Sequence, residues 1–407
     1  MIVRFLLWLM ITDKACHAMS PSSSPSAHHK KATTTSNPPT SPYDPHWALY
    51  PNTYVAKRLT YQPGTLPFYQ RLDGDLSKDI WKAVPWSTYF GDIQGDDAPQ
   101  DGHRPAPTRF KALWDDDYLY IGALLEVSPE FSTQAHFTKR NSPIYQKDSD
   151  FEVFVDAPGC HQDYKEFEMN AINTVWNLLL DKPYRDGGRE HSGRIAQPGD
   201  ADYYDVVNQH SAAKIVKGRL NDPTGQGATW SVEIAFSFTD LLSRYNPPVD
   251  RPQVGTMWRI NFSRVELQGQ VNWTWQPQRI WDASTQRHVG LVDMHLPDAW
   301  GYLVFGNVND SSASEPKDRT WPARLTAMNV YYALHYYREQ HNGSYTPSLQ
   351  DLSVDPALVT PFDIRIDVNV PSFRNEDGTG FVVTVKGHDG VVVTVRDDRL
   401  LKVKVVG

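Results

Sequence analysis

The chain has 407 residues, 40% of them hydrophobic and 22% charged, which leaves room for two or three globular domains of ordinary composition. The formal net charge is −8 and lysine and arginine form no long cluster, so the sequence does not support a nucleic-acid partner or a basic helix on a membrane surface. Aromatic residues reach 12%, a content that suits a β-rich core as well as a surface that stacks against a ligand.

The N-terminus has the features of a secretory signal. Arg4 precedes the apolar run "FLLWLMI", and the following "CHA" places small residues at Cys16 and Ala18. We therefore predict a signal peptide over residues 1–18 and a secreted, periplasmic or cell-surface location. The apolar run is too short to cross a bilayer, so we expect no membrane span.

Residues 19–46 are rich in proline, serine and threonine, a composition that cannot bury enough apolar surface to order itself. We predict a flexible linker there. Beyond the signal peptide the only cysteine is Cys160, so no disulfide can form within the mature chain. It lies in "DAPGCHQD", which is typical of a turn.

Short strands with alternating apolar residues follow over residues 47–306. In "DYLYIGALLEV" and "TWSVEIAFSF" every second residue is apolar, and glycine, proline, aspartate and asparagine separate such segments. No helical stretch is long enough for an α/β fold. The pattern predicts an all-β domain built as a β-sandwich.

Residues 307–320 form a second predicted linker, and residues 321–407 a small α+β domain. "TWPARLTAMNVYYALHYYREQHNG" predicts one helix, with Thr320 able to cap it and Gly343 closing it. Four alternating segments after the helix predict an antiparallel meander. This order of a tyrosine-rich helix, a "G-x-Y" stretch and strands loosely resembles the globular part of type IV pilins and pseudopilins. We leave the protein partner of this domain open.

The segment "YKEFEMNAINTVW", residues 164–176, carries the clearest candidate site. On an extended backbone its apolar residues face the core, whereas its polar residues and Trp176 share the other face. We expect Glu152, Glu168, Asn170 and Trp176 to line one concave, solvated patch. Carboxylates and amides bond to hydroxyl groups, and an indole packs on the apolar side of a sugar ring.

Seven segments in order resemble the family 9 carbohydrate-binding modules. They are "RLDGDLSKDIWKAVPW", "RFKALWDDDYLYIGALLEV", "DSDFEVFVDAPG", "YKEFEMNAINTVWNLLL", "TWSVEIAFSF", "GTMWRINFSRVE" and "MHLPDAWGYLVF". The resemblance covers roughly residues 66–306 and implies a β-sandwich of the DOMON-like type. It also implies that the domain binds a carbohydrate and acts together with polysaccharide-degrading enzymes.

The resemblance carries over to the site only in part. The resemblance implies a terminal sugar held between two tryptophans. The first of these positions falls near Tyr145, and the second falls near Met294 and His295, where this chain has no tryptophan. The glutamate that the family uses to hold sugar hydroxyls matches Glu152 in this chain. The family's polar residue on the following strand matches Glu168. Together with the strand pattern, the resemblance predicts a carbohydrate-binding set of Tyr145, Glu152, Glu168, Asn170, Trp176, Asn261, Arg264, Trp275 and His295. Ser263 belongs with Asn261 in a row of polar residues on the same strand. For Arg264 the alternative is a structural ion pair.

Three other functions stay open at this stage. A glycoside hydrolase would need two positioned carboxylates, for which Glu166 and Glu168 are available. A haem-binding DOMON-type domain would need axial ligands such as His136 or Met169. A surface-display or interaction module is the third. We favour a carbohydrate-binding protein without catalytic residues, bound metal or cofactor, with a structural calcium ion near "WDDDY" or "DSDFEVFVD" as the alternative to solvated aspartates.

Overall fold

The computed structural model describes residues 41–61, 64–308, 316–374 and 378–406. The predicted signal peptide and residues 19–40 of the predicted linker lie outside this part of the chain, as do residues 309–315 of the second linker. Residues 41–407 belong to one compact unit.

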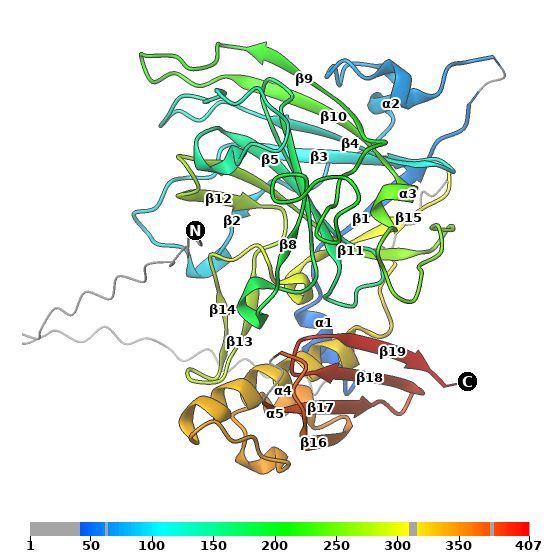
Figure 1. Ribbon diagram of the computed structural model, residues 1–407, viewed down its shortest axis with the longest axis vertical. Helices are drawn as coiled ribbons and strands as arrows, with labels where there is room; N and C mark the ends of the chain where they lie inside the picture. The colour runs from blue at the N-terminus through cyan, green and yellow to red at the C-terminus, as the bar shows by residue number, and fades with distance from the viewer. Residues whose placement is uncertain (1–40, 62–63, 309–315, 375–377, 407) are drawn as a thin grey trace, which may run out of the picture. The chain divides into compact units, whose positions relative to one another are not determined.

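Alternating apolar residues build most of the chain up to residue 306 into strands (Figure 1). Thirteen of them form one hydrogen-bonded sheet, in which β12 and β2 branch off at β11. They are β1 (Thr53–Arg58), β2 (Gly91–Asp92), β3 (Thr108–Trp114), β4 (Tyr118–Leu125), β5 (Asp150–Asp156), β6 (Tyr164–Asn170), β7 (Val175–Leu180), β8 (Glu190–His191), β9 (His210–Lys217), β10 (Thr229–Ser237), β11 (Met257–Glu266), β12 (Val271–Thr274) and β15 (Gly301–Phe305).

Strand β1 divides this sheet into two layers. Residues 53–56 of β1 pair with β15, and the first layer continues in the order β11, β5, β6, β7 and β8. Lys57 and Arg58 pair with β3, and the second layer continues in the order β4, β10 and β9. The two layers pack face to face through aromatic rings: the Phe110 and Phe262 ring centroids lie 3.9 Å apart, and those of Phe167 and Phe236 lie 4.8 Å apart. The predicted β-sandwich is therefore confirmed.

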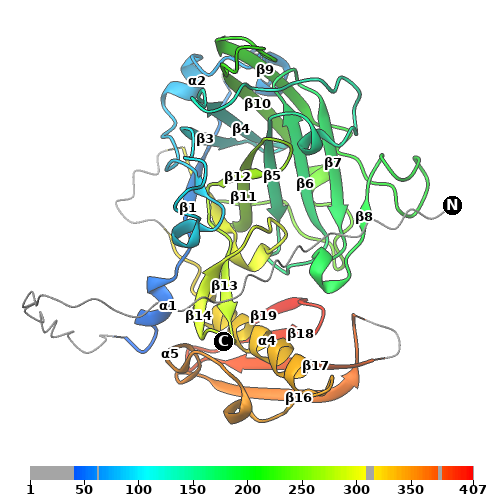
Figure 2. The ribbon, with the colours of Figure 1, turned by 90° about the vertical axis from the view of Figure 1, so that its left-hand side faces the viewer.

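The C-terminal part is one helix on a meander, as predicted. Helix α4 (Trp321–Gln340) lies along one face of the four-stranded sheet β16 (Asp363–Pro371), β17 (Thr379–Lys386), β18 (Val391–Arg396) and β19 (Leu401–Val405) (Figure 2). The sheet is antiparallel throughout, and its alternate valines are buried under the helix.

Thr320 does not cap α4 with its side chain, contrary to the prediction. Its hydroxyl donates to Asp318 Oδ1 at 2.7 Å and accepts from Arg324 Nε at 2.9 Å. Asp318 is itself tied to the sandwich, because Tyr302 donates to its carboxylate at 2.8 Å and its own N–H donates to the Tyr50 hydroxyl at 2.7 Å. The end of the predicted second linker is thus anchored on the sandwich.

The end of the predicted first linker is folded as well. Residues 44–48 form α1 (Asp44–Ala48), in which Pro45 suits the first turn of a helix. His46 is fully buried, and its Nε2 lies 3.0 Å from Thr326 Oγ1 and 3.0 Å from the Leu358 carbonyl oxygen. A linker over residues 44–46 is therefore wrong, because His46 packs against α4 and its neighbours.

The remaining elements are short. They are α2 (Asp79–Lys82), α3 (Phe238–Leu241), α5 (Pro356–Val359), the hairpin β13 (Arg279–Asp282) and β14 (Arg287–Gly290), and the 3₁₀ turns η1 (Phe68–Arg71), η2 (Gly95–Asp97), η3 (Ile144–Gln146), η4 (Tyr184–Asp186), η5 (Pro297–Ala299) and η6 (Leu349–Asp351). Across the described part of the chain, we find no helix with the length and hydropathy of a bilayer-spanning segment.

Candidate functional site

The predicted polar patch exists as one face of the layer formed by β11, β5, β6 and β7. Ser263 pairs with Glu152, Glu152 with Glu168, and Glu168 with Trp176, so these four side chains form one row across the sheet. Side chains two residues apart along a strand share a face. Asp150, Asn170, Glu166 and Asn261 therefore lie on the same face, in the neighbouring rows.

Residues 164–176 are not one continuous strand, which corrects the expectation from the sequence. A turn separates β6 from β7 because the Asn170 Oδ1 accepts the N–H groups of Ile172 at 3.2 Å and Thr174 at 2.8 Å, and Asn173 adopts a left-handed φ of 63°. Trp176 reaches the glutamates by strand pairing across this turn. The amide group of Asn170 is occupied in closing the turn.

The face is also dry, where the sequence suggested a solvated hollow. Glu152, Glu168 and Trp176 are 5%, 2% and 5% exposed. An apolar cluster around Ile144, Trp176, Met294 and Trp300 covers it from outside. The Tyr145 ring stacks on Trp176 at 5.7 Å, and the Arg194 guanidinium lies 5.0 Å from the indole centroid. Tyr145 and Arg194 thus occupy the space beside the Trp176 indole in which a sugar ring would stack.

Burial dominates the electrostatics of this face. It raises the pKa of Asp150, Glu166 and Glu168 well above the usual range, and repulsion between neighbouring carboxylates adds to the effect. Burial also raises the pKa of Glu152 to about 7. These carboxyl groups are therefore poor anions unless a cation joins them.

Two further predicted residues lie at the margins of this face. The Asn261 amide is used internally, because its Nδ2 donates to the Gln276 carbonyl oxygen at 2.9 Å and its Oδ1 accepts from the Gln276 N–H at 3.0 Å. His295 lies 3.1 Å from the Tyr164 hydroxyl through Nδ1, and burial lowers its pKa to about 4.

Arg264 and Trp275 do not belong to the patch, which corrects their grouping with it. Arg264 alternates to the inner face of β11, where it is fully buried and its Nε donates to Glu266 at 2.8 Å. The structural ion pair is therefore the better account of Arg264. Trp275 meets Phe110 edge to face at 5.2 Å in the core, and one side of its indole reaches a different site.

That site is an aromatic groove beside the start of β1, which the sequence did not indicate. Two cavities of about 550 and 680 Å³ share five lining residues, Tyr50, Pro51, Asn52, Thr88 and Trp275. We call the two together the aromatic groove. Its other Trp and Tyr lining residues are Trp47, Tyr54, Trp86, Tyr89, Trp281, Trp321 and Tyr332.

Hydrogen bonds and cation–π contacts fix the groove walls. Asn52 bridges to the segment after β12, since its Nδ2 donates to the Trp275 carbonyl oxygen at 2.7 Å and its N–H donates to Gln276 Oε1 at 2.8 Å. The Arg109 guanidinium lies 4.5 Å from the Trp86 centroid and 5.2 Å from that of Tyr89. Tyr89 is 55% exposed, so its ring is open to a ligand.

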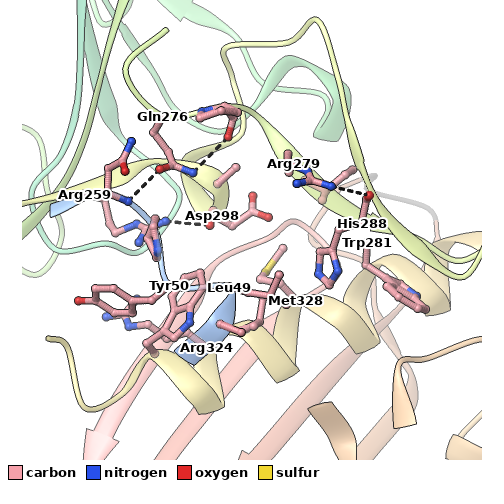
Figure 3. Close-up of a pocket in the computed structure, with 18 of the residues that line it drawn as sticks. Leu49, Tyr50, Arg259, Gln276, Arg279, Trp281, His288, Asp298, Arg324 and Met328 are labelled. Carbon is pink, nitrogen blue, oxygen red and sulfur yellow. Dashed lines mark hydrogen bonds between the residues drawn. The ribbon is translucent and has the colours of Figure 1, made fainter. Parts of the chain in front are cut away.

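The smaller cavity carries polar donors that the protein leaves unused. Arg259 and Arg279 line it (Figure 3), as does Asn329. The buried atoms Arg259 Nη1, Arg279 Nε and Asn329 Nδ2 find no hydrogen-bond partner among the described residues. Buried donors usually have partners. A ligand rich in acceptor oxygens would satisfy these three.

The family model described as carbohydrate family 9 binding domain-like matches residues 72–277, half of the chain. The chain belongs to this family. A search of the curated proteins found no match. The family supports saccharide binding, and the matched residues contain the polar face as well as Trp86, Tyr89 and Trp275 of the aromatic groove.

Solved structures of this kind show weak overall similarity to the chain. A candidate carbohydrate-binding protein from Bacteroides uniformis is 12% identical, with a TM-score of 0.42 over 63% of this chain and 99% of its own. A family 9 module from Caldicellulosiruptor kristjanssonii in complex with cellotriose is 17% identical, with a TM-score of 0.35 over 66% of this chain and all of its own. The complex of a Caldicellulosiruptor kristjanssonii family 9 module with glucose is 16% identical, with a TM-score of 0.36 over 65% of this chain and all of its own.

Within this carbohydrate family 9 binding domain-like chain, the two sites differ in access. The polar face that the sequence singled out is closed by packed side chains, whereas the aromatic groove is open. Sequence reasoning missed the groove because its wall combines β-sandwich residues with Trp47, Tyr50 and Trp321, which the sequence placed at domain edges. The signals for it were the high aromatic content and Trp275, which the sequence analysis placed in the carbohydrate-binding set and which lines both cavities.

Proposed function

We propose that the chain is an exported carbohydrate-binding protein that holds a saccharide in the aromatic groove and acts in polysaccharide degradation without cleaving its ligand. The observation that carries the proposal is the lining of the groove, where the exposed Tyr89 ring and the half-buried Trp86 ring accompany buried donors without partners among the described residues. Rings such as Tyr89 and Trp86 would stack on the apolar side of a pyranose. Its hydroxyl oxygens would accept from Arg259, Arg279 and Asn329.

The charge state of Asp298 supports binding without hydrolysis. Glycoside hydrolysis needs a protonated carboxyl group as well as a carboxylate. Asp298 lines the smaller cavity, and burial would raise its pKa, but the Arg399 guanidinium outweighs burial and holds the pKa below the usual range. Arg399 Nη1 donates to it at 2.7 Å and Tyr332 at 2.7 Å. Asp298 is thus a poor proton donor.

A glycan array with the full chain tests the proposal. We expect binding of one saccharide class with a Kd of micromolar to millimolar order. Tyr89→Ala and Trp86→Ala should each weaken that binding about tenfold, the loss expected for one stacked ring. Phe373→Ala, which removes a 41% exposed ring outside the groove lining, should bind as the parent does.

Two results would reject the proposal in different ways. Absence of any glycan signal from the folded parent protein rejects saccharide binding itself. A signal that Tyr89→Ala and Trp86→Ala leave unchanged keeps saccharide binding and rejects the aromatic groove. Release of reducing sugar from the polysaccharides that bind would show that the chain is a glycoside hydrolase and not only a binding protein.

A further inference from the structure

The smaller cavity of the aromatic groove has a cationic lining, although the chain as a whole carries a net charge of −8. Arg259, Arg279 and Arg324 line it, and Asp298 is the one acidic residue among its described lining residues. The Asp298 carboxylate already accepts a hydrogen bond from Arg399 Nη1 at 2.7 Å, and Arg399 is not part of the lining. The lining therefore carries more positive than negative charge.

The three arginines differ in their ionic partners. Arg324 Nε lies 3.3 Å from the Asp318 carboxylate, and Arg279 Nη1 lies 3.5 Å from that of Asp96, which is 93% exposed. Arg259 forms no ion pair with any residue that the structure describes, although it is only 3% exposed. Its charge is therefore both removed from water and uncompensated by a neighbouring carboxylate.

The other deeply buried arginines show what Arg259 lacks. In the described part of the chain, Arg264 and Arg399 are buried to the same degree. Arg264 Nε pairs with Glu266 at 2.8 Å, and Arg399 Nε pairs with Asp186 at 2.6 Å. Charged side chains are rarely buried without such a partner. An anion at Arg259 would make it like the other two.

The Arg259 guanidinium is fixed in place with one nitrogen unused. Its Nη2 donates to the Asp298 carbonyl oxygen at 2.8 Å, and its Nε donates to the Pro297 carbonyl oxygen at 3.4 Å. Its Cζ lies 4.3 Å from the Tyr302 ring centroid and 5.4 Å from that of Trp321. Nη1 is buried and has no hydrogen-bond partner among the described residues. Nη1 is thus a preorganised, charged donor.

A second unused group lies at the same end of the cavity. His161 lines the cavity, is 2% exposed, and its Nδ1 has no hydrogen-bond partner within the described residues. Burial lowers the pKa of His161 to about 3, and the nearby Arg324 and Arg259 lower it further. Gly159, in the same turn after β5, is flanked by both arginines, since a Cβ there would lie 3.1 Å from Arg259 Cγ and 3.3 Å from Arg324 Nη1. The neutral imidazole can bond to a ligand without adding charge.

We propose that the saccharide of the aromatic groove is an acidic one, and that its carboxylate or sulfate ester binds Arg259 at the His161 end of the smaller cavity. The inference rests on the proposed function and narrows its ligand class. Guanidinium groups bind oxyanions through charge-assisted hydrogen bonds, which are stronger than bonds to neutral hydroxyl groups. The cavity of about 550 Å³ has the size of a small-ligand site, and Trp275 and Tyr50 in its lining can pack on the sugar ring.

A glycan array that pairs acidic oligosaccharides with their neutral counterparts tests the inference. Uronic acid oligosaccharides are printed beside their methyl esters, and sulfated oligosaccharides beside the desulfated forms. At low ionic strength we expect the full chain to bind the acidic member of one pair about tenfold more tightly than the neutral member. The preference should shrink in about 0.5 M NaCl, because salt screens the attraction. A preference within the uronic acid pairs identifies a carboxylate, and one within the sulfated pairs identifies a sulfate ester.

Calorimetric titration of variants with the selected pair locates the oxyanion. Arg259→Gln should reduce the acidic preference to less than about twofold and change the affinity for the neutral member much less. Arg279→Gln, at a side chain that is 37% exposed and easier to replace without unfolding, should reduce the preference about threefold. Arg365→Gln, the same change at a 74% exposed arginine outside the groove lining, should keep the preference of the parent protein.

Three results would count against the inference. Equal binding of acidic and neutral members would overturn it and leave the proposed function in place. An acidic preference that Arg259→Gln and Arg279→Gln both leave unchanged would also overturn it, since the oxyanion would then bind elsewhere. Absence of binding to every member of the array would reject the proposed function and the inference together.

Discussion

Two buried groups of carboxylates in this molecule have opposite electrostatic settings. Asp186 and Asp298 share the fully buried Arg399, whose Nε donates to Asp186 at 2.6 Å and whose Nη1 donates to Asp298 at 2.7 Å. Asp150 and Glu168 on the sandwich face have no such partner among the described residues. The first group has its counter-charge within the fold, whereas the second group is buried without one and favours the protonated form.

The pKa values follow this difference. Burial raises the pKa in both groups, but Arg399 outweighs it at Asp186 and Asp298, whose pKa values fall below the usual range. At Asp150 and Glu168, burial and neighbouring carboxylates act in the same direction and raise the pKa. A built-in guanidinium therefore decides whether a buried carboxylate stabilises the fold at neutral pH.

The largest expected effect is the removal of the built-in cation. Arg399→Met leaves Asp298 buried without its guanidinium partner and leaves Asp186 with only the longer 3.5 Å ion pair to Arg374, so we expect the free energy of unfolding to fall by about 3–5 kcal/mol. Urea denaturation of the full chain measures it. Arg365→Met removes an arginine that is 74% exposed beside Asp367, and it should cost less than about 1 kcal/mol. Similar losses in the two variants would contradict the comparison.

The opposite sign is expected on the sandwich face. At pH 8, Glu168→Gln removes a buried carboxyl group that has no cationic partner among the described residues, so the free energy of unfolding should rise by about 1–2 kcal/mol, the order of the penalty for a buried polar group without a partner. The same denaturation experiment gives the value. A clear loss of stability would mean that Glu168 has a favourable partner, and the contrast with Arg399 would fail.

The next largest effect is the pH dependence of the free energy of unfolding, which should differ in sign between the two groups of carboxylates. An acid whose pKa is raised by folding holds more protons in the folded state, so its stabilisation is present at low pH and is lost as the pH rises. For Glu152 the window runs from 4.5 to about 7, with a slope of at most about 1.4 kcal/mol per pH unit. Urea denaturation of the protein across this range should show the decline.

Asp186 and Asp298 should behave in the reverse manner. Their lowered pKa values mean that their stabilisation is present at neutral pH and is lost as the pH falls through the acidic range below 3.8. A stability that is flat between pH 4.5 and about 7 would contradict the raised pKa values on the sandwich face.

The smallest effect concerns the arginine nearest the Trp176 indole. Arg194 is 39% exposed, pairs with Glu190 and stacks over Trp176, so Arg194→Met should cost less than about 1 kcal/mol. Urea denaturation of the full chain measures this loss. A loss of more than about 2 kcal/mol would show that the guanidinium does more than pair with Glu190 and pack over Trp176.

Much of the fold follows from local patterns. Alternation predicted the sandwich, the helix on a meander and the shared face of Glu152, Glu168 and Trp176. It also placed Arg264 in an otherwise apolar row, which fits its buried ion pair with Glu266. These features depend on neighbours in the chain or on adjacent strands.

The rest depends on contacts between distant segments. The burial of the polar face comes from loop residues such as Ile144 and Met294, which are far apart in the sequence. The aromatic groove joins Tyr50 with Trp86 and Trp275. No local pattern encodes which loop covers a face, so the sequence could identify the polar face but could not show that it is closed.

A crystal structure of the full chain with the saccharide that the glycan array selects is the most direct test of the central claim. We predict density for a sugar ring in the aromatic groove, against Tyr89 or Trp86 and within hydrogen-bonding distance of Arg259. Density for the sugar against Trp176 instead, with Tyr145 displaced, would contradict the account.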